Sequence, residues 1–386
     1  MEMSGPGVSR HRRTVKRRRW GRLRQHWNML GLFEIDQQHE FYSLTCMMKE
    51  GLCAAVQNTI DNPLPLSEDD YNLEVTQIHK DFRMETYAGP VFASLRRSLG
   101  MTEKEYQQSL SSEGSYLQFI SNSKSKADFF LTNDKQFFLK TQSKREVRFL
   151  LSNLRIYMEH LEKYPHSLLV KFLGTCYKTL LVFCVQKYFI VMQSVFYPDD
   201  RITARYDIKG CEMSRWTDPA PEGSQIIVVL KDLNFEGQLI QLDQQCPWFL
   251  RQVEIDTAFL QTLNVLDYSL LLAHQPLHQD ELNQSLSFAT LIMRAKNMVG
   301  AESADLQIVQ AQNRRLLPNF KNPLHVIDGP EQRYFIGIID IFTVYGFKKR
   351  LEHLWKSLRH PRQTFSTVSP PAYCHRLCQW VQDHTK

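Results

Sequence analysis

Residues 129–140 read FFLTNDKQFFLK, and this stretch indicates how the first half of the chain folds. Two apolar runs, 129–132 and 137–140, flank a polar segment that begins with Asn133 and Asp134. Aromatic-rich runs on both sides of an Asn-Asp turn are typical of an antiparallel β-hairpin. The sequence therefore predicts that an antiparallel sheet begins here.

Outward from the hairpin, helical and strand-like patterns are mixed rather than strictly alternating. Apolar spacing and turn residues predict helices over 39–59, 91–99, 103–110, 146–161 and 247–263, and strands over 180–185, 188–191, 202–209, 225–230, 265–272 and 335–345. A sheet with helices is followed by a connector and a mixed second half. We therefore expect an α+β fold rather than a doubly wound parallel sheet.

The chain of 386 residues is long enough for one large two-lobed unit. We expect a basic tail over 1–30, an N-terminal lobe over 31–195 and a C-terminal lobe over 196–386. The segment 274–331 is polar and rich in Gln and Asn, with Pro and Gly near its end. We interpret it as an insert in the C-terminal lobe.

The composition excludes several classes of protein. Hydrophobic residues make up 43% of the chain, which is normal for a globular protein. No charge-free run of about 18 apolar residues exists, so we expect no transmembrane helix. No apolar core follows the charged N-terminus, so we expect no secretory signal. The eight cysteines are scattered, mostly among apolar neighbours, which indicates a reduced, intracellular protein.

The net charge of +6 is concentrated near the N-terminus, where 10–24 read RHRRTVKRRRWGRLR. Such a run repels itself and binds polyanions. Taken alone, it fits an anionic membrane surface, a nuclear-import or nucleic-acid patch, or a solvated tail. Trp20 and Trp27 suit the first interpretation, because tryptophan favours the membrane interface.

Four side chains have the chemistry of phosphoryl transfer, which needs a cation on the ATP phosphates and carboxylates near magnesium and the attacking hydroxyl. Lys140 ends the second hairpin strand, and Glu146 follows on the next helix, where the two could pair. Asp340 and Asp267 are single acids within IGIIDIF and LNVLDYSLLL. A buried carboxylate is costly unless it is paired or binds a metal, although a turn or capping role explains Asp267 equally well.

Several segments resemble motifs of the phosphatidylinositol-phosphate kinases, in that family's order over about residues 40–386. YDIKGCEMSR (206–215) resembles the DLKGS motif, LNVLDYSLLL (263–272) the MDYSLL motif and IGIIDIFTVY (336–345) the IID motif. DFRMETYAGPVFASLRRSLG (81–100) and LLVKFLGTCY (168–177) are similar to N-lobe segments. The resemblance implies the family's two-lobed, SAICAR synthase-like fold.

The resemblance also implies a nucleotide site for ATP and Mg²⁺. Lys140, oriented by Glu146, is expected to hold the ATP phosphates, and Asp340 to bind magnesium. Met192 is expected to lie against the adenine, and Lys209 near the phosphates.

A lipid site is implied as well. Asp267 is expected to orient the inositol hydroxyl or accept its proton, and Arg215 to lie near the lipid head. Within 346–371, KKRLEHLWKSL (348–358) resembles the activation loop of type I members, which phosphorylate phosphatidylinositol 4-phosphate at the 5-position. Lys349, Arg350 and Glu352 occupy the places that help choose the lipid.

The chain departs from the family where a glycine-containing stretch is expected to cover the phosphates. No glycine occurs over 116–140, and Lys126 and Asp128 stand in that stretch. Glycine lets backbone amides approach a phosphate without a side chain in the way, whereas Asp128 adds a negative charge. Milder departures from the motifs are Cys211, Glu212 and Asn234.

These features lead us to expect a kinase-fold protein of weak or absent activity that scaffolds or regulates type I phosphatidylinositol 4-phosphate 5-kinases, through mixed pairs. The alternative is an active lipid 5-kinase with an unusual phosphate loop. In either case we expect a cytoplasmic protein that binds phosphatidylinositol 4-phosphate and anionic membrane peripherally. Nucleic acid is not an expected partner, because the aromatic platforms of that class are missing.

Overall fold

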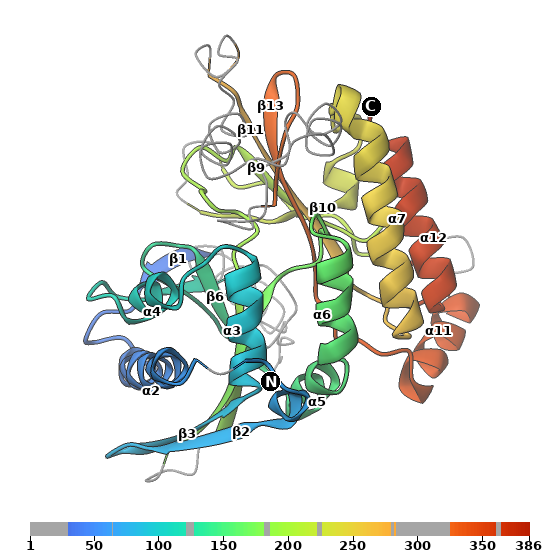
Figure 1. Ribbon diagram of the computed structural model, residues 1–386. Helices are drawn as coiled ribbons and strands as arrows, with labels where there is room; N and C mark the ends of the chain where they lie inside the picture. Colours follow the sequence, from blue (N-terminus) through green and yellow to red (C-terminus); the bar gives the residue numbers. More distant parts are fainter. Residues whose placement is uncertain are drawn as a thin grey trace, which may run out of the picture.

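The computed structural model describes residues 30–63, 65–120, 127–180, 186–221, 226–278, 282, 325–359 and 364–386. Each of two lobes is built on one antiparallel or mixed sheet, and helices cover the sheets (Figure 1). The α+β, two-lobed expectation is confirmed. The basic run 10–24 lies outside the described residues.

The N-terminal lobe contains an eight-stranded sheet in the order β1-β4-β5-β6-β8-β7-β3-β2. The expected hairpin is present, since Phe130 of β5 pairs with Leu139 of β6 in antiparallel register. Helix α3 packs on β7, and α2 packs on α3 and α4. The bounds are β1 Gly31–Glu34, α2 Tyr42–Asp61, β2 Glu74–Ile78, β3 Phe82–Tyr87, α3 Gly89–Ser98, α4 Glu103–Ser111, β4 Leu117–Ile120, β5 Phe129–Leu131, β6 Phe137–Gln142, α5 Lys144–Ser152, α6 Leu154–Lys163, β7 Phe172–Leu180 and β8 Gln186–Gln193.

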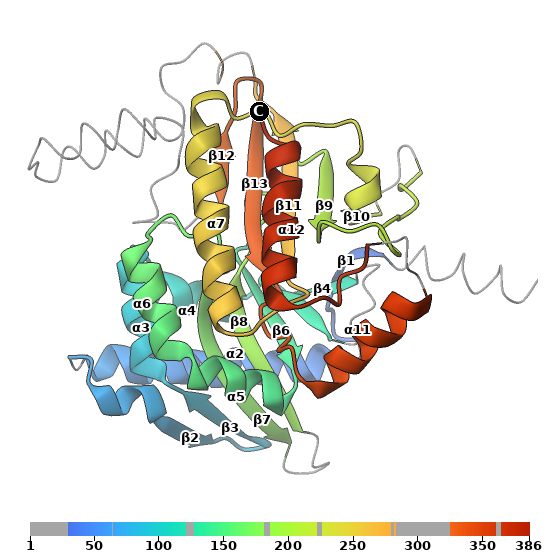
Figure 2. The same cartoon turned by 90° about the vertical axis from the view of Figure 1, so that its right-hand side faces the viewer.

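The C-terminal lobe contains a five-stranded sheet in the order β10-β9-β11-β13-β12. Helices α7 and α12 lie side by side on one face of this sheet, as both views show (Figures 1 and 2). Helix α11 follows β13 and lies beside the bottom of α12 (Figure 2). The bounds are β9 Ala204–Ile208, β10 Leu230–Lys231, α7 Cys246–Thr262, β11 Ser269–Pro276, β12 Val326–Asp328, β13 Gln332–Ile339, α11 Phe347–Arg359 and α12 Pro370–Asp383.

Backbone and side-chain hydrogen bonds join the two lobes into one body. The Val170 amide donates to the Ile338 carbonyl at 2.9 Å, and the Ile338 amide donates to the Leu168 carbonyl at 2.7 Å. Asp256 of α7, which is fully buried, accepts from the Leu168 amide and bonds His160 of α6, both at 2.7 Å. Because these contacts cross from one lobe to the other, they fix the geometry of any site between the lobes.

The helix expected over 146–161 is two helices, α5 and α6, with Asn153 between them. The Asn153 side chain donates to the Phe149 carbonyl at 2.8 Å. An asparagine that bonds the preceding turn in this way competes with the helical pattern. The continuous apolar spacing conceals the break.

Several expected strands have different bounds. Of the strand expected over 180–185, Leu180 is the last residue of β7, and 181–185 lie outside the described residues. The strand expected over 188–191 lies within β8. Of the strand expected over 225–230, only Leu230 is in β10. β11 and β12 occupy the two ends of the expected insert 274–331, most of which lies outside the described residues.

Candidate functional site

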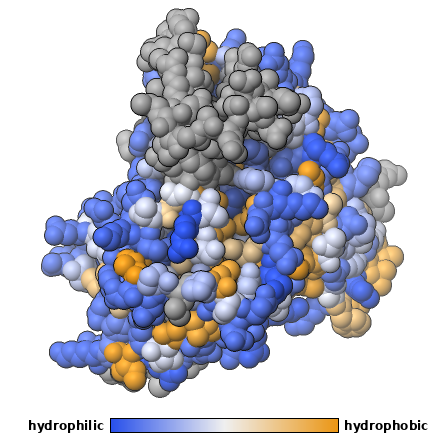
Figure 3. Space-filling model, in the orientation of Figure 1, coloured by the Kyte–Doolittle hydropathy of each residue, from blue (hydrophilic) through white to orange (hydrophobic). Residues whose placement is uncertain are grey.

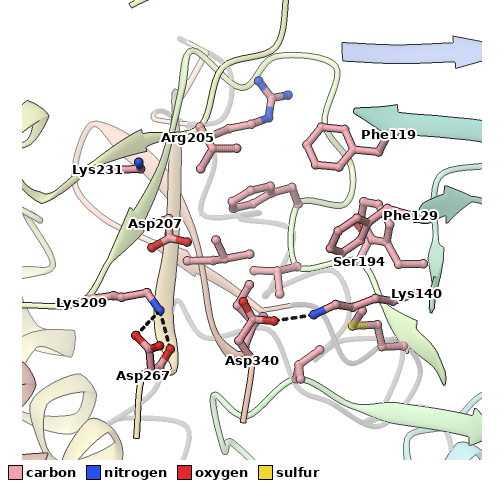
Figure 4. Close-up of a pocket in the computed structure, with 18 of the residues that line it drawn as sticks. Phe119, Phe129, Lys140, Ser194, Arg205, Asp207, Lys209, Lys231, Asp267 and Asp340 are labelled. Atoms are coloured by element: carbon pink, nitrogen blue, oxygen red, sulfur yellow. Dashed lines mark hydrogen bonds and ion pairs between the residues drawn. The ribbon is translucent and has the colours of Figure 1, made fainter. Parts of the chain in front are cut away.

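A cavity of about 590 Å³ lies between the lobes. Its N-lobe wall is apolar and aromatic, and includes Phe119, Phe129, Phe138 and Met192. Its C-lobe wall carries most of the charged side chains that Figure 4 shows, and Lys140 of the N-lobe faces them. Seven lysines and arginines line the cavity against four aspartates. An excess of basic groups in a concave site suits a polyanionic ligand.

Asp267 and Asp340 enter this cavity at the ends of neighbouring strands. Ser269, the first residue of β11, pairs with Ile339, the last residue of β13. Asp267 lies just before Ser269 and Asp340 just after Ile339, so both aspartates lie at the same end of these two strands. Both have left-handed backbone, with φ of 65° at Asp267 and 62° at Asp340. Aspartate and asparagine tolerate this region better than other residues with a Cβ. The strands expected over 265–272 and 335–345 are interrupted at these two positions for this reason.

Lys140 of β6 binds Asp340 and not Glu146. The Lys140 ammonium lies 2.6 Å from Asp340 Oδ1 and 5.2 Å from the centre of the Phe129 ring. Glu146 accepts instead from the amide and hydroxyl of Ser143, at 2.8 and 2.6 Å, which caps the start of α5. The expected Lys140–Glu146 pair is therefore wrong in this structure, because a capping box uses the carboxylate locally.

Lys209 binds the other acid of the cavity, Asp267. Its ammonium is 2.9 Å from Asp267 Oδ1 and also donates to the Asp267 carbonyl. Lys349 of α11 approaches the second carboxylate oxygen of Asp267 at 3.6 Å. Each aspartate thus faces at least one lysine (Figure 4).

These lysines determine how the acids titrate. Burial would raise the pKa of Asp340, but the charge and hydrogen bond of Lys140 lower it below its usual value. Burial would also raise the pKa of Asp267, but Lys209 and then Lys349 lower it. Both carboxylates are therefore ionised at neutral pH.

Arg215 lines the cavity but is held by two aspartates. Its guanidinium lies 2.5 Å from Asp207 and 2.5 Å from Asp232. Asp232 Oδ1 also accepts from the amides of Lys209 and Gly210, at 2.9 and 2.7 Å. Asp232 was not identified from the sequence, because an acid after Lys231 is typical of a surface turn. Its role is to shape the 207–215 turn that positions Lys209.

Asn234, which departs from the family motif, has a structural role. Its side-chain oxygen accepts from the amides of Thr217 and Lys231, at 3.0 and 3.1 Å, and its nitrogen donates to the Thr217 carbonyl at 2.8 Å. These bonds use both ends of the amide to join two backbone segments.

Lys349, Arg350 and Glu352 all lie on α11, which was expected as an activation loop. Glu352 bonds Lys349 at 3.1 Å and Lys356 at 2.6 Å. Arg350 lies over the Tyr345 ring at 5.7 Å. Of the three, Lys349 reaches the cavity through its contact with Asp267.

The stretch that lacks glycine includes β4 and β5, and Phe119 of β4 and Phe129 of β5 both line the cavity. Lys126 lies outside the described residues. The Asp128 carboxylate pairs with Lys187 of β8 at 2.7 Å. The expectation that Asp128 adds a free negative charge to the phosphate site is therefore wrong, because Lys187 neutralises it.

The donor set fits a magnesium-bound nucleotide in its chemistry. Carboxylate oxygens such as those of Asp340 and Asp267 are the ligands that Mg²⁺ prefers. The lysines of the cavity can bind phosphate oxygens, and the apolar wall around Met192 and Phe138 can contact a planar base. The lysines at present bind the acids, so a metal ion would have to compete with Lys140 for Asp340.

Comparisons with known proteins agree with this chemistry. Residues 110–384 match the family model described as phosphatidylinositol-4-phosphate 5-kinase. The chain is 58% identical to human phosphatidylinositol 4-phosphate 5-kinase-like protein 1 over 95% of this chain and 92% of the relative, and 52% identical to the mouse protein of the same name over 94% and 91%. It is also 27% identical to a phosphatidylinositol 4-phosphate 5-kinase of Schizosaccharomyces pombe, over 98% of this chain and 58% of that protein. Because the family model covers most of the chain and the similarity to two relatives is high over nearly their whole length, the chain belongs to the phosphatidylinositol-4-phosphate 5-kinase family.

Proposed function

We propose that this chain is a kinase-fold protein of weak or absent lipid kinase activity that regulates or scaffolds active phosphatidylinositol 4-phosphate 5-kinases at membranes. One observation carries the proposal: no glycine occurs over 116–140, the stretch that contains β4 and β5, and both strands contribute side chains to the cavity. Loss of one hydrogen-bond donor to the charge that develops in the transition state raises the activation free energy by about 3–4 kcal/mol, which lowers the rate about 10²- to 10³-fold. The loss of several such donors leaves little turnover.

The nucleotide site is part of the same proposal. Lys140 and Lys209 would hold phosphate oxygens, Asp340 would hold Mg²⁺ and Met192 would contact the base. When bound, the metal would neutralise charge on the transferred phosphoryl group. Asp267 would accept a hydrogen bond from the attacking inositol hydroxyl, and its ionised state at neutral pH supports this role.

Helix α11 supports peripheral membrane contact. No helix among the described residues is both long and apolar enough to cross a bilayer. The helix α11 has no buried residue, and it exposes Phe347, Leu351, Leu354, Trp355 and Leu358. This apolar surface is visible at the right-hand edge of the molecule (Figure 3). Basic residues next to an exposed apolar helix face favour binding to anionic lipid.

The outer edge of the N-lobe sheet supports pairing with another kinase. β2 is the last strand of the eight-stranded order, and Ile78 at its end is 81% exposed. An unpaired strand edge can pair with another chain. A mixed pair with a type I kinase would place this chain next to an active enzyme on a cytoplasmic membrane surface.

The alternative is an active 5-kinase. Lys140, Asp267 and Asp340 are retained, and all three line one cavity. These residues favour turnover only if the β4–β5 connection can cover the phosphates.

The test is a lipid kinase assay of the purified chain on vesicles of phosphatidylinositol 4-phosphate, beside an active type I kinase. We expect turnover at least about 10³-fold below that of the active enzyme. Restoring glycine with Lys126→Gly and Ala127→Gly should increase it, and Asp340→Asn in that background should remove the gain. Turnover of the unmodified chain at the rate of the active enzyme would refute the proposal. For the scaffold role, we expect the two proteins to co-elute in size-exclusion chromatography, and separate elution counts against it.

A further inference from the structure

Helix α11 is held against the body of the protein by polar contacts. It has no buried residue, and its large apolar side chains are exposed. Its contacts with the following segment include those of His353 and Lys356 with the Phe365 ring and hydrogen bonds to Thr367, which is fully buried. His353 Nδ1 bonds the Thr367 carbonyl at 2.7 Å.

Glu352 and Thr367 form the centre of a hydrogen-bonded clasp. The Thr367 hydroxyl donates to Glu352 Oε1 at 2.8 Å and accepts from Lys356 at 3.0 Å. Lys356 also bonds the same Glu352 oxygen at 2.6 Å. Burial would raise the pKa of Glu352, but the hydrogen bonds of Lys356, Thr367 and Lys349 together lower it, so Glu352 is ionised.

The clasp contacts Asp267 of the cavity through Lys349, and Lys356 of the clasp lines the cavity itself. The Lys349 ammonium lies 3.1 Å from Glu352 Oε2 and 3.6 Å from Asp267 Oδ2. Because Thr367 and Lys356 hold one oxygen of Glu352, the other oxygen is directed at Lys349. The same ammonium therefore lies between a carboxylate of α11 and the carboxylate proposed to face the inositol hydroxyl.

We propose that Thr367, acting through Glu352, positions Lys349 against Asp267, so that Asp267 and the phosphomonoester of a lipid headgroup compete for one ammonium. Thr367 is a positioning residue in this arrangement. The inference rests on the membrane contact proposed for α11. Its consequence is that headgroup binding draws Lys349 away from Asp267, while Lys209 still binds this carboxylate.

Competition between Asp267 and the headgroup for Lys349 predicts the direction in which headgroup affinity should change. Apparent affinity for a ligand falls by the fraction of protein in which the binding group is free. Weakening the clasp should therefore tighten binding of the headgroup, and this gain should require Lys349. A purely structural role for Thr367 would change binding whether or not Lys349 is present.

The test uses the full chain and phosphatidylcholine vesicles that contain phosphatidylinositol 4-phosphate, with binding measured by co-sedimentation. We expect Thr367→Val to tighten binding about fivefold, which corresponds to about 1 kcal/mol. In a Lys349→Met background the same change should have no effect. Thr364→Val is the matched control, because Thr364 lies in the same segment and bonds the Glu212 amide rather than α11.

Three results would overturn the inference: no gain with Thr367→Val, an equal gain in the Lys349→Met background, or an equal gain on phosphatidylserine vesicles of the same surface charge. If Thr367→Val does not fold, Glu352→Gln provides the same comparison at a partly exposed position. Because neither kinase activity nor a protein partner is measured, failure of the scaffold proposal leaves this test unaffected.

Discussion

Replacing Asp340 by asparagine tests the Lys140–Asp340 pair. Asparagine keeps the shape and tolerates the φ of 62° at this position, whereas alanine would add backbone strain. The change removes the partner of an ammonium that is 2.6 Å away and only 9% exposed. A hydrogen bond to a charged group contributes about 1.5–3 kcal/mol, and breaking a fully buried pair costs about 3–5 kcal/mol. Since the Asp340 side chain is 41% exposed, we expect a loss near the lower of these ranges, about 2 kcal/mol.

This loss predicts a small but measurable change in thermal unfolding. An unfolding entropy of about 2.1 cal/mol/K per residue gives a fall in Tm of about 2–3 °C for a chain of this size. Lys140→Met should cost a similar amount, because it leaves Asp340 without its lysine. The double variant should be no less stable than either single variant, since no unpaired charge remains. If the stability losses of the two single variants add up in the double variant, the reasoning is refuted.

The same variant tests magnesium binding in differential scanning fluorimetry. ATP with Mg²⁺ at about 100 times its dissociation constant stabilises the native state by about 2.7 kcal/mol, which raises Tm by about 3 °C here. We expect Asp340→Asn to remove the part of the shift that depends on Mg²⁺. A shift of the same size in the variant would show that Asp340 does not hold the metal. No shift in the unmodified chain would show that the nucleotide site is not used.

Two further predictions concern other parts of the molecule. Burial lowers the pKa of Lys171 to about 8, so this lysine binds fewer protons in the folded state than in the unfolded state. The free energy of unfolding of the unmodified chain, relative to that of Lys171→Met, should therefore rise by up to about 3 kcal/mol as pH increases from about 8 to the unfolded value of about 10.4. Urea unfolding of both chains across this pH range measures the difference; a difference that stays constant would contradict the assignment to Lys171. On α11, Leu351→Asp should weaken co-sedimentation with anionic vesicles at least about tenfold, because it places a charge in the apolar face. Leu239→Asp, at a similarly exposed site in the C-lobe, should have little effect, and equal losses would refute a role for α11.

The sequence predicts the fold class and the key cavity residues because these depend on local patterns. The hairpin over 129–140 follows from two apolar runs around a polar turn. Asp267 and Asp340 stand out because a lone acid in an apolar run has few explanations other than function or a special backbone conformation. The structure shows the special backbone conformation at both positions, and both aspartates line the cavity.

Pairings between distant residues could not be predicted in this way. Glu146 was expected to bind Lys140, but the serine three residues earlier is a capping partner that the sequence also offers. Asp232 supports the 207–215 turn through contacts that depend on how β10 lies beside β9. The sequence pattern of a capping box at 143–146 indicates the partner of Glu146. Nothing in the local sequence indicates the partners of Asp232.

The ion pairs of the cavity also change what the retained residues imply about activity. Lys140 with Asp340, and Lys209 with Asp267, each neutralise a charge that would be costly to leave alone between the lobes. Loss of any one of the four would therefore destabilise the protein whether or not it transfers phosphate. Their presence fits an active kinase and an inactive kinase fold equally well. We propose that activity depends instead on groups that do not stabilise the fold, and that the glycine-free sequence between β4 and β5 is such a place.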